Sequence, residues 1–242
     1  MINIEDIINT VVCGDCLDVL SEMPDGCVDM VLTDPPYGIG ESNEKNHSRD
    51  CLCKTTDFGH YQWDTTKLPD NTILEMVRVS RNQIIFGGNY YGAVLGNTSC
   101  YIVWDKDNGA TDFADCELAW ASFDKAVRRV KWRWQGMLQE PGTTKEKRVH
   151  PTQKPLGVAK WIVERYSTPG ETILDPCCGS GTFCVAAKML GRNYIGIDIS
   201  EDYCQIARDR LKALDSAVPV AEARAGQIGL FETTLEEPPM RD

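Results

Sequence analysis

The sequence contains no apolar run close to the roughly 20 residues that a membrane-spanning helix needs. Its start, MINIEDIINT, also lacks the basic stretch followed by an apolar stretch that is typical of a secretory signal. Both absences favour a cytoplasmic protein. Positive charge is scarce as well, since 25 Lys and Arg face 36 Asp and Glu and give a net charge of -11. Such a chain is a poor general binder of polyanions, so any surface for nucleic acid must be local.

Cysteine is abundant, but its pattern does not favour disulfides. The 11 Cys are odd in number, and most stand inside apolar segments, which favours reduced and packed thiols. Cys13 and Cys16 have the C-x-x-C spacing of a redox or zinc site, to which Cys51 and Cys53 could add ligands. No second pair has firm spacing, so we expect no metal.

The 242 residues, 42% of them hydrophobic, can bury one large core, and they show no repeat or internal linker. Strand-like and helix-like apolar periods alternate along the chain, which is the pattern of an α/β fold with a mainly parallel sheet. We expect seven strands, at residues 10–13, 28–33, 83–86, 101–104, 117–121, 172–174 and 194–197. We expect helices at residues 71–80, 156–166, 182–190 and 201–214, the first with an apolar stripe of Ile73, Met76 and Val77.

Three stretches fit neither period. Residues 38–66 are polar and irregular, and we expect a mobile loop there. Residues 123–149 are basic and aromatic and are predicted to be a surface excursion that carries function. Residues 216–242, with two acidic residues followed by two prolines near the end, are predicted to be a flexible tail.

Residues 31–40 read VLTDPPYGIG, and here an apolar strand ends abruptly in an acid, two prolines and an aromatic. Proline lacks the N–H that a sheet ladder needs, so the tetrapeptide Asp34 to Tyr37 is a poor continuation of a strand. Two prolines in succession fix a rigid turn whose carbonyl points outward. The tetrapeptide is therefore predicted to present polar groups at the end of a buried strand.

A second motif, ETILDPCCGSGTFCVAAKML, covers residues 171–190. Its strand ends at Asp175 and runs through the turn Gly179 to Gly181 into a helix, a context in which glycines let the backbone approach a cofactor closely. The next strand, NYIGID, ends in Asp198 at about the distance at which Rossmann-like folds place an acid on ribose hydroxyls. No Lys-Ser/Thr pair follows the glycines, which disfavours a triphosphate. The favoured interpretation is a nucleoside cofactor.

DPPY, HPTQKP at residues 150–155 and DPCCGSGTF occur in this order along the chain. Together they resemble the S-adenosylmethionine-dependent DNA amino-methyltransferases of the beta arrangement, in which the catalytic half precedes the cofactor half. The resemblance implies a Rossmann-like, doubly wound, mainly parallel seven-stranded sheet with helices on both faces, in one catalytic domain over residues 1–215. It also implies site-specific methylation of adenine N6, because the cytosine-N4 enzymes more often open the tetrapeptide with Ser.

The resemblance gives the tetrapeptide a chemical role. The exocyclic amino nitrogen of adenine is a poor nucleophile because its lone pair is delocalised into the ring. The Asp34 carboxylate and the Pro35 carbonyl can each accept one amino hydrogen and so direct the lone pair at a methyl donor. Pro36 makes the turn rigid, and Tyr37 offers a flat face to a flipped-out base, with stacking worth about 1 to 3 kcal/mol.

The resemblance also implies S-adenosylmethionine as the cofactor. It places Asp15 at the cofactor's adenine, although a helix N-cap at Asp15 is an alternative. It places His150, Thr152 and Lys154 at the methionine end, where an ammonium and a hydroxyl suit a carboxylate. The full predicted cofactor set is Asp15, Cys16, His150, Thr152, Lys154, Asp175, Cys177, Gly179, Ser180, Gly181, Thr182, Phe183, Asp198 and Ile199.

A doubly wound sheet binds ligands beyond the carboxyl ends of its strands, where the strand order reverses. The resemblance places the strand of Asp175 beside the strand of Asp34 at that point. Donor and acceptor sites should then share one crevice.

Residues 123–149 correspond by position to the target-recognition region of the beta arrangement. Eight cations gather here against three acids, so the charge is locally positive. Trp132 and Trp134 either pack this insert or contact bases, and a solvated loop with a β-hairpin is the alternative for the whole segment. The predicted DNA-binding residues are Lys125, Arg128, Arg129, Lys131, Arg133, Lys147 and Arg148.

Several alternatives stay open at this point. An N4-cytosine DNA methyltransferase comes first, followed by RNA or protein-glutamine N-methyltransferases, which motif order disfavours, and by a binding module without activity. The expected partner is DNA, with double strands favoured over single strands, and a homodimer and a cognate restriction nuclease are further candidates. The sequence does not specify the recognition site.

Overall fold

The computed structural model describes residues 2–39, 66–109, 114–135, 138–143, 145–146, 148–150 and 152–216. The loop expected over residues 38–66 lies outside these ranges except at its ends. The tail expected over residues 216–242 also lies outside them, apart from Ser216 at the end of the last helix.

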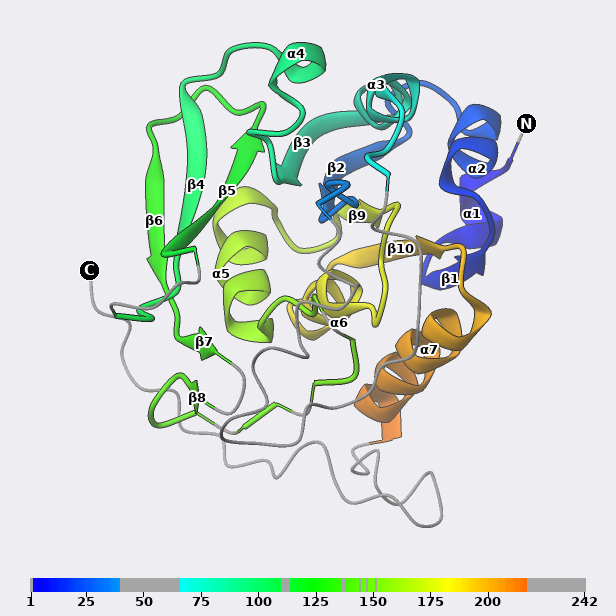
Figure 1. Ribbon diagram of the computed structural model, residues 1–242. Helices are drawn as coiled ribbons and strands as arrows, with labels where there is room; N and C mark the ends of the chain where they lie inside the picture. Colours follow the sequence, from blue (N-terminus) through cyan, green and yellow to red (C-terminus); the bar gives the residue numbers. More distant parts are fainter. Residues whose placement is uncertain are drawn as a thin grey trace.

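An eight-stranded sheet forms the centre of the molecule (Figure 1). Every neighbouring pair is parallel except where β5 runs antiparallel to both β3 and β4. In spatial order the strands are β1 (Thr10–Cys13), β10 (Asn193–Asp198), β9 (Thr172–Asp175), β2 (Val28–Thr33), β3 (Ser80–Phe86), β5 (Cys116–Ala121), β4 (Cys100–Asp105) and β6 (Arg128–Lys131).

Helices cover both faces of the sheet (Figure 1). Alternate residues of a strand point to opposite faces, so Met30 and Leu32 of β2 enter one hydrophobic cluster and Val31 enters the other. The first cluster also contains residues of α5 (Leu156–Tyr166), α6 (Thr182–Met189) and α7 (Glu201–Ser216). Against the second pack α1 (Ile4–Ile7), α2 (Cys16–Glu22), α3 (Asp70–Val79) and α4 (Gly92–Leu95). Of the helices in the described ranges, none combines the length and the apolar character that crossing a membrane requires.

The expected helices are all present, with ends shifted by at most two residues. The apolar stripe of α3 was predicted only in part: Ile73 and Met76 are fully buried, whereas Val77 is 38% exposed. Thr72 and Val79 complete the buried face of α3 instead, and Val77 lies outside this face.

The sheet has one strand more than the seven expected. The eighth, β6, pairs in parallel with β4 at the edge of the sheet, inside the segment predicted to be a surface excursion. Only Val130 of its four residues is buried, so the sequence of β6 lacks the alternation of apolar and polar residues that predicts a strand. The hairpin alternative for the segment is confirmed in part, because β7 (Trp134–Gln135) and β8 (Leu138–Gln139) pair antiparallel.

Candidate functional site

The carboxyl ends of β2 and β9 lie side by side near the middle of the sheet, with Val31 paired to Leu174. After β9 the chain passes through α6 on one face to reach β10, and after β2 it returns through α3 on the other face to reach β3. A crevice opens where the connections that follow two neighbouring parallel strands go to opposite faces of the sheet. The predicted placement of the Asp175 strand beside the Asp34 strand is confirmed.

A cavity of about 340 Å³ occupies this crevice, a volume within the usual range for small-molecule sites. Of the predicted catalytic residues, Asp34 and Pro36 line it. Every predicted cofactor residue lines it except Gly181. The sequence did not predict a further group of lining residues: Gly14, Leu17, Leu68, Pro69, Thr72, Gln153, Pro176, Cys178, Ser200 and Tyr203.

Gly181 packs against α7 and is the one predicted cofactor residue that does not line the cavity, so its contact with a cofactor stays a prediction. Its φ of +77° is in the left-handed region that favours glycine. A Cβ at this position would lie 2.8 Å from Cβ of Ala207 in α7. The close approach that glycine permits here is therefore between the turn and α7.

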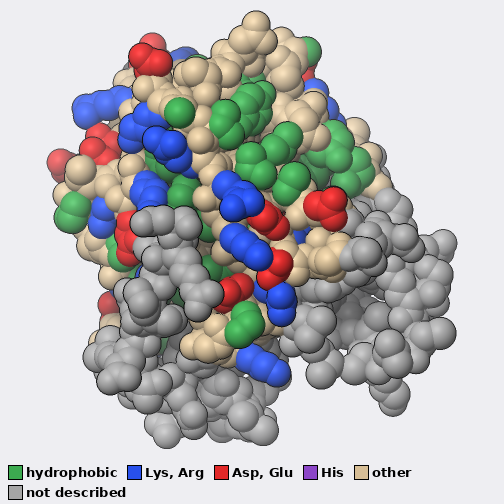
Figure 2. Space-filling view, turned by 90° about the vertical axis from the view of Figure 1, so that its left-hand side faces the viewer, with side chains coloured by type: hydrophobic (Ala, Val, Ile, Leu, Met, Phe, Trp, Pro, Cys, Tyr) green, Lys and Arg blue, Asp and Glu red, His purple; other side chains and the backbone are tan. Residues whose placement is uncertain are grey.

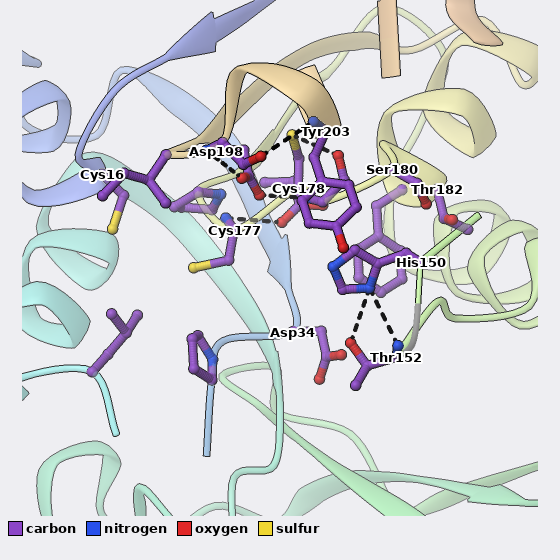
Figure 3. Close-up of a pocket in the computed structure, with 18 of the residues that line it drawn as sticks. Cys16, Asp34, His150, Thr152, Cys177, Cys178, Ser180, Thr182, Asp198 and Tyr203 are labelled. Carbon is purple, nitrogen blue, oxygen red and sulfur yellow. Dashed lines mark hydrogen bonds between the residues drawn. The ribbon is translucent and has the colours of Figure 1, made fainter. Parts of the chain in front are cut away.

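Asp198 ties the end of β10 to the glycine turn (Figure 3). Its Oδ2 accepts from the N–H of Gly179 at 2.8 Å, and its Oδ1 accepts from the N–H of Ser200 at 2.9 Å. Burial raises the pKa of this carboxyl, and the two N–H groups oppose the rise. Each oxygen keeps a second lone pair for a ligand hydroxyl.

Asp175 is a buried acid between the two halves of the site. Its Oδ1 accepts from the Thr33 hydroxyl at 2.8 Å and from the N–H of Cys177 at 3.3 Å. Burial raises its pKa to about 8, and the carboxylates of Asp34 and Asp198 add to the rise against these two hydrogen bonds. A proton on this carboxyl is therefore favoured at pH 7.

His150 lies between the glycine turn and α7 (Figure 3). Its ring centroid is 4.3 Å from that of Tyr203, and its Nδ1 accepts from the N–H of Thr152 at 3.2 Å. Burial lowers the pKa of His150 to about 3, helped by the charges of Lys154 and Arg148. The imidazole is thus neutral at physiological pH, and its acceptor, Nδ1, is taken by Thr152.

Both interpretations of Asp15 find support in the structure. Asp15 lines the cavity and also caps α2, since its Oδ1 accepts from the N–H of Leu17 at 2.8 Å.

The C-x-x-C spacing does not form a ligand pair: the Cys13 sulfur groups with Glu201 and Cys204, within 4.8 Å of one another, while Cys16 lines the cavity.

Arg210 supports the turn from behind and was not predicted. It is 3% exposed, and its Nη1 donates to the Ser180 carbonyl at 2.6 Å, the Ser180 hydroxyl at 3.0 Å and the Thr182 hydroxyl at 3.2 Å. The sequence did contain a signal, because Arg210 stands three residues after Ala207 on the buried face of α7.

The predicted catalytic carboxylate of Asp34 has two side-chain partners. It accepts from the hydroxyl of Tyr37 and forms an ion pair with Lys154. Lys154 is only 7% exposed, and its Nζ lies 3.1 Å from Oε2 of Glu117 on β5. The ammonium predicted for a cofactor carboxylate is therefore engaged by Asp34 and Glu117. Sequence reasoning missed Glu117, which a strand 83 residues further along the chain brings to the site.

Aromatic side chains hold the tetrapeptide in place. The hydroxyl of the buried Tyr91 donates to the Pro36 carbonyl. The Tyr37 ring packs against Gly87, where a Cβ would lie 2.1 Å from Cε1, and stacks on Tyr90 with centroids 4.9 Å apart. Tyr90 is 42% exposed, so the aromatic face of Tyr37 is covered by a side chain that reaches the surface.

Three of the seven predicted DNA-binding cations are paired with acids. Lys131 and Arg133 lie 2.9 Å and 2.6 Å from the carboxylate oxygens of Asp107, and Arg129 lies 3.7 Å from Asp105. On the side of the molecule where β6 forms the edge of the sheet, Lys and Arg side chains are interspersed with Asp and Glu side chains (Figure 2). The local positive charge is thus smaller than the segment alone suggests, because β4 and the loop after it bring carboxylates beside β6.

The remaining members of that set differ among themselves. Lys125 lies over the rings of Phe123 and Tyr166, at 5.2 Å and 4.8 Å from their centroids. Burial lowers the pKa of Arg148, and Lys147 lies outside the described residues.

The two tryptophans pack the insert. Trp134 is 8% exposed in the core, and the Trp132 ring packs on Gly157, where a Cβ would lie 2.2 Å from it. Their burial decides between the two predicted roles in favour of packing.

Comparisons with known proteins agree with this geometry. A family model described as DNA methylase matches residues 96–209. The Type II methyltransferase M.HinfI of Haemophilus influenzae is 28% identical over 255 residues, which cover 88% of this chain and 70% of that protein. The crystal structure of an M1.HpyAVI–SAM complex is 25% identical, with a TM-score of 0.52 and coverage of 84% of this chain and 98% of that one.

The cytosine-N4-specific PvuII DNA methyltransferase shares the fold alone, at 12% identity and a TM-score of 0.54 over 83% of this chain and 85% of its own. The family match and these similarities support an S-adenosylmethionine-dependent DNA amino-methyltransferase. The family comprises enzymes for adenine N6 and enzymes for cytosine N4.

Proposed function

We propose that this protein methylates the exocyclic N6 of adenine in DNA. The observation that carries the proposal is that Asp34 opens into the same cavity as the glycine turn and Asp198. A hydrogen-bond acceptor for an amino group and the groups suited to a nucleoside cofactor thus share one space.

The residues around the cavity fit S-adenosylmethionine. The two Asp198 oxygens keep lone pairs for ribose hydroxyls. Ile199 is 69% exposed and lines the cavity, so it offers an apolar wall to a purine. The hydroxyls of Ser180 and Thr182, which Arg210 holds, suit the polar methionine end. When bound, S-adenosylmethionine supplies a sulfonium methyl group, which the amino nitrogen takes while the sulfur keeps the bonding electron pair.

Asp34 and Pro35 prepare the amino group. The Asp34 carboxylate accepts one amino hydrogen and the Pro35 carbonyl the other, which frees the nitrogen lone pair to point into the cavity. The methylated nitrogen must lose one proton, and the Asp34 carboxylate is the base in reach. Pro36 holds the turn rigid through the Tyr91 hydrogen bond to its carbonyl.

Tyr37 receives the base after it leaves the duplex. Its ring is fixed by the hydrogen bond that its hydroxyl donates to Asp34 and by its packing against Gly87. Tyr90 stacks on the same ring, so entry of a base onto this face requires Tyr90 to swing out. Stacking of about 1 to 3 kcal/mol per base offsets much of the cost of flipping.

Adenine is favoured over cytosine by the Asp that opens the tetrapeptide. The amino group of cytosine presents the same two hydrogens, so N4-cytosine methylation is the second candidate. Mass spectrometry of nucleosides from methylated DNA distinguishes N6-methyladenine from N4-methylcytosine directly.

The DNA is proposed to lie across the exposed cations of β6. Arg128 and Arg129 are exposed candidates, and Arg129 lies 3.7 Å from Asp105, farther than Lys131 and Arg133 lie from Asp107. A homodimer, a cognate nuclease and a cytoplasmic location stay predictions.

The test is a radiolabelled methyl-transfer assay with DNA, RNA and protein substrates. We expect transfer to DNA by the wild type, and none by Asp34→Ala, which should still bind S-adenosylmethionine in calorimetry. Transfer to RNA or protein alone, or substantial turnover by Asp34→Ala, would overturn the proposal.

A further inference from the structure

Four charged side chains of alternating sign form a chain of contacts that begins at the active-site carboxylate: Asp34, Lys154, Glu117 and Lys106. Lys154 pairs with Asp34, and its Nζ lies 3.1 Å from Oε2 of Glu117. The other oxygen of Glu117, Oε1, lies 2.7 Å from Nζ of Lys106. Asp34 and Lys154 line the cavity, while Glu117 and Lys106 stand behind them and are not among its lining residues.

Burial makes the charges of Glu117 and Lys154 depend on their neighbours. Burial raises the pKa of Glu117, but the ammonium groups of Lys154 and Lys106 outweigh this and the net shift is downward. Burial lowers the pKa of Lys154, but the carboxylates of Asp34 and Glu117 outweigh this and the net shift is upward. Both groups are therefore charged at neutral pH, and one ammonium serves two carboxylates.

Asp34 is the member on which the proposed chemistry depends. Burial raises its pKa, Lys154 opposes the rise, and the Glu117 carboxylate adds to it. An ammonium held by Asp34 alone would draw electron density from the carboxylate and weaken it as an acceptor of amino hydrogens. Because Glu117 shares that ammonium, Asp34 stays a stronger acceptor.

We propose that Glu117 is a positioning residue of the methyl transfer, which acts through Lys154 to keep Asp34 a strong hydrogen-bond acceptor. This rests on the proposed function, which makes Asp34 the acceptor. Lys106 holds Glu117 from the far side and so keeps its carboxylate from pairing with Lys154 alone. Among the described residues, the titratable groups that face Asp34 are Tyr37, Lys154, Glu117 and Asp175.

The first measurement is the titration of the Asp34 side-chain carboxyl by carbon-13 NMR. Glu117→Gln removes a like charge, so the Asp34 titration should move to lower pH by roughly two units, as expected for one charge a few ångströms away at an effective dielectric of about 20. Lys154→Met removes the opposite charge and should move it to higher pH. Glu164→Gln on the exposed face of α5 is the matched control for net charge and should leave it unchanged.

The second measurement is the pH profile of kcat. In Glu117→Gln we expect its acid limb to move to lower pH together with the Asp34 titration, and kcat to fall about tenfold because the acceptor is weaker. KM for S-adenosylmethionine should stay within about twofold, since Glu117 does not reach the cavity. A merely structural role would lower kcat without moving the acid limb.

An unchanged Asp34 titration in Glu117→Gln, or shifts of the same sign in Glu117→Gln and Lys154→Met, would overturn the proposal. If Glu117→Gln does not fold, Lys106→Met tests the same contact with Glu117 in place. Without Lys106, Glu117 should draw Lys154 away from Asp34, and the Asp34 titration should move to higher pH. A wild-type protein that transfers no methyl group to DNA would overturn the proposed function instead, and the NMR titration separates the two failures.

Discussion

The hydroxyl of Thr33 donates to Oδ1 of Asp175 at 2.8 Å, and both side chains are buried. Thr33 ends β2, which leads into the tetrapeptide, and Asp175 ends β9, which leads into the glycine turn. This one hydrogen bond therefore joins the acceptor half and the cofactor half of the site across the point where the strand order reverses.

Asp175 should make stability depend on pH. Its folded pKa of about 8 exceeds the unfolded value of about 3.9, so between these values the folded state binds more protons. Its stabilising contribution is then full below pH 4 and is lost as pH rises toward 8. We expect Asp175→Asn to flatten the fall of the unfolding free energy over this range, by up to about 1.4 kcal/mol per pH unit. Urea denaturation from pH 5 to pH 8 measures it.

Asp18→Asn, in α2, is the control for this experiment and should leave the pH slope as it is in the wild type. A wild-type slope in Asp175→Asn would mean that the carboxyl is ionised in the folded protein.

Gly181→Ala should destabilise the fold more than a glycine in open space does. Its Cβ would meet Ala207, whereas Gly191, with a similar φ of +74°, has nothing within 4 Å. Gly191→Ala thus measures the backbone strain alone, about 1 to 3 kcal/mol for a residue forced into this region. We expect Gly181→Ala to lower the melting temperature further than Gly191→Ala.

Ala207→Gly in α7 should relieve part of the Gly181→Ala defect, although glycine costs a helix about 1 kcal/mol by itself. A double-mutant cycle without coupling between the two positions would contradict the contact.

Asp198→Ala should weaken S-adenosylmethionine binding. The change removes the acceptor for ribose hydroxyls and also frees the N–H of Gly179, which loosens the turn. Calorimetry should show at least about a tenfold higher Kd, equivalent to about 1.4 kcal/mol. Asp202→Ala, on the exposed side of α7, is the control; equal affinities in both variants would show that the cofactor is held elsewhere.

The cations of β6 and Arg133, which follows it, should contribute unequally to DNA binding. Lys131 and Arg133 are already paired with Asp107, so Arg128→Ala with Arg129→Ala should reduce the salt dependence of DNA affinity more than Lys131→Ala with Arg133→Ala. Each lost phosphate contact should lower the slope of log K against log salt by roughly 0.9. Equal slopes in both double variants and the wild type would place the DNA surface elsewhere.

Local patterns in the sequence determined most of the scaffold. The seven predicted strands and four predicted helices were found because an apolar period or a Pro and Gly signal marks each of them. The tetrapeptide, the glycine turn and the 150–155 segment were found because their chemistry is written in consecutive residues. That the tetrapeptide and the glycine turn share one crevice followed from the resemblance together with the rule for doubly wound sheets, and the structure confirms it.

Contacts between distant strands and helices were decided only by the tertiary structure. Strand β6 has one apolar residue among charged ones, so its sequence does not predict a strand. It is a strand because it pairs with β4. Glu117 reaches Lys154, and Asp107 neutralises part of the basic insert, because separate segments meet in space. Gly181 was singled out by the glycine motif, but its close packing against α7 was not predicted. Period and motif are properties of neighbouring residues, whereas charge balance and close packing depend on residues that only the folded sheet brings together.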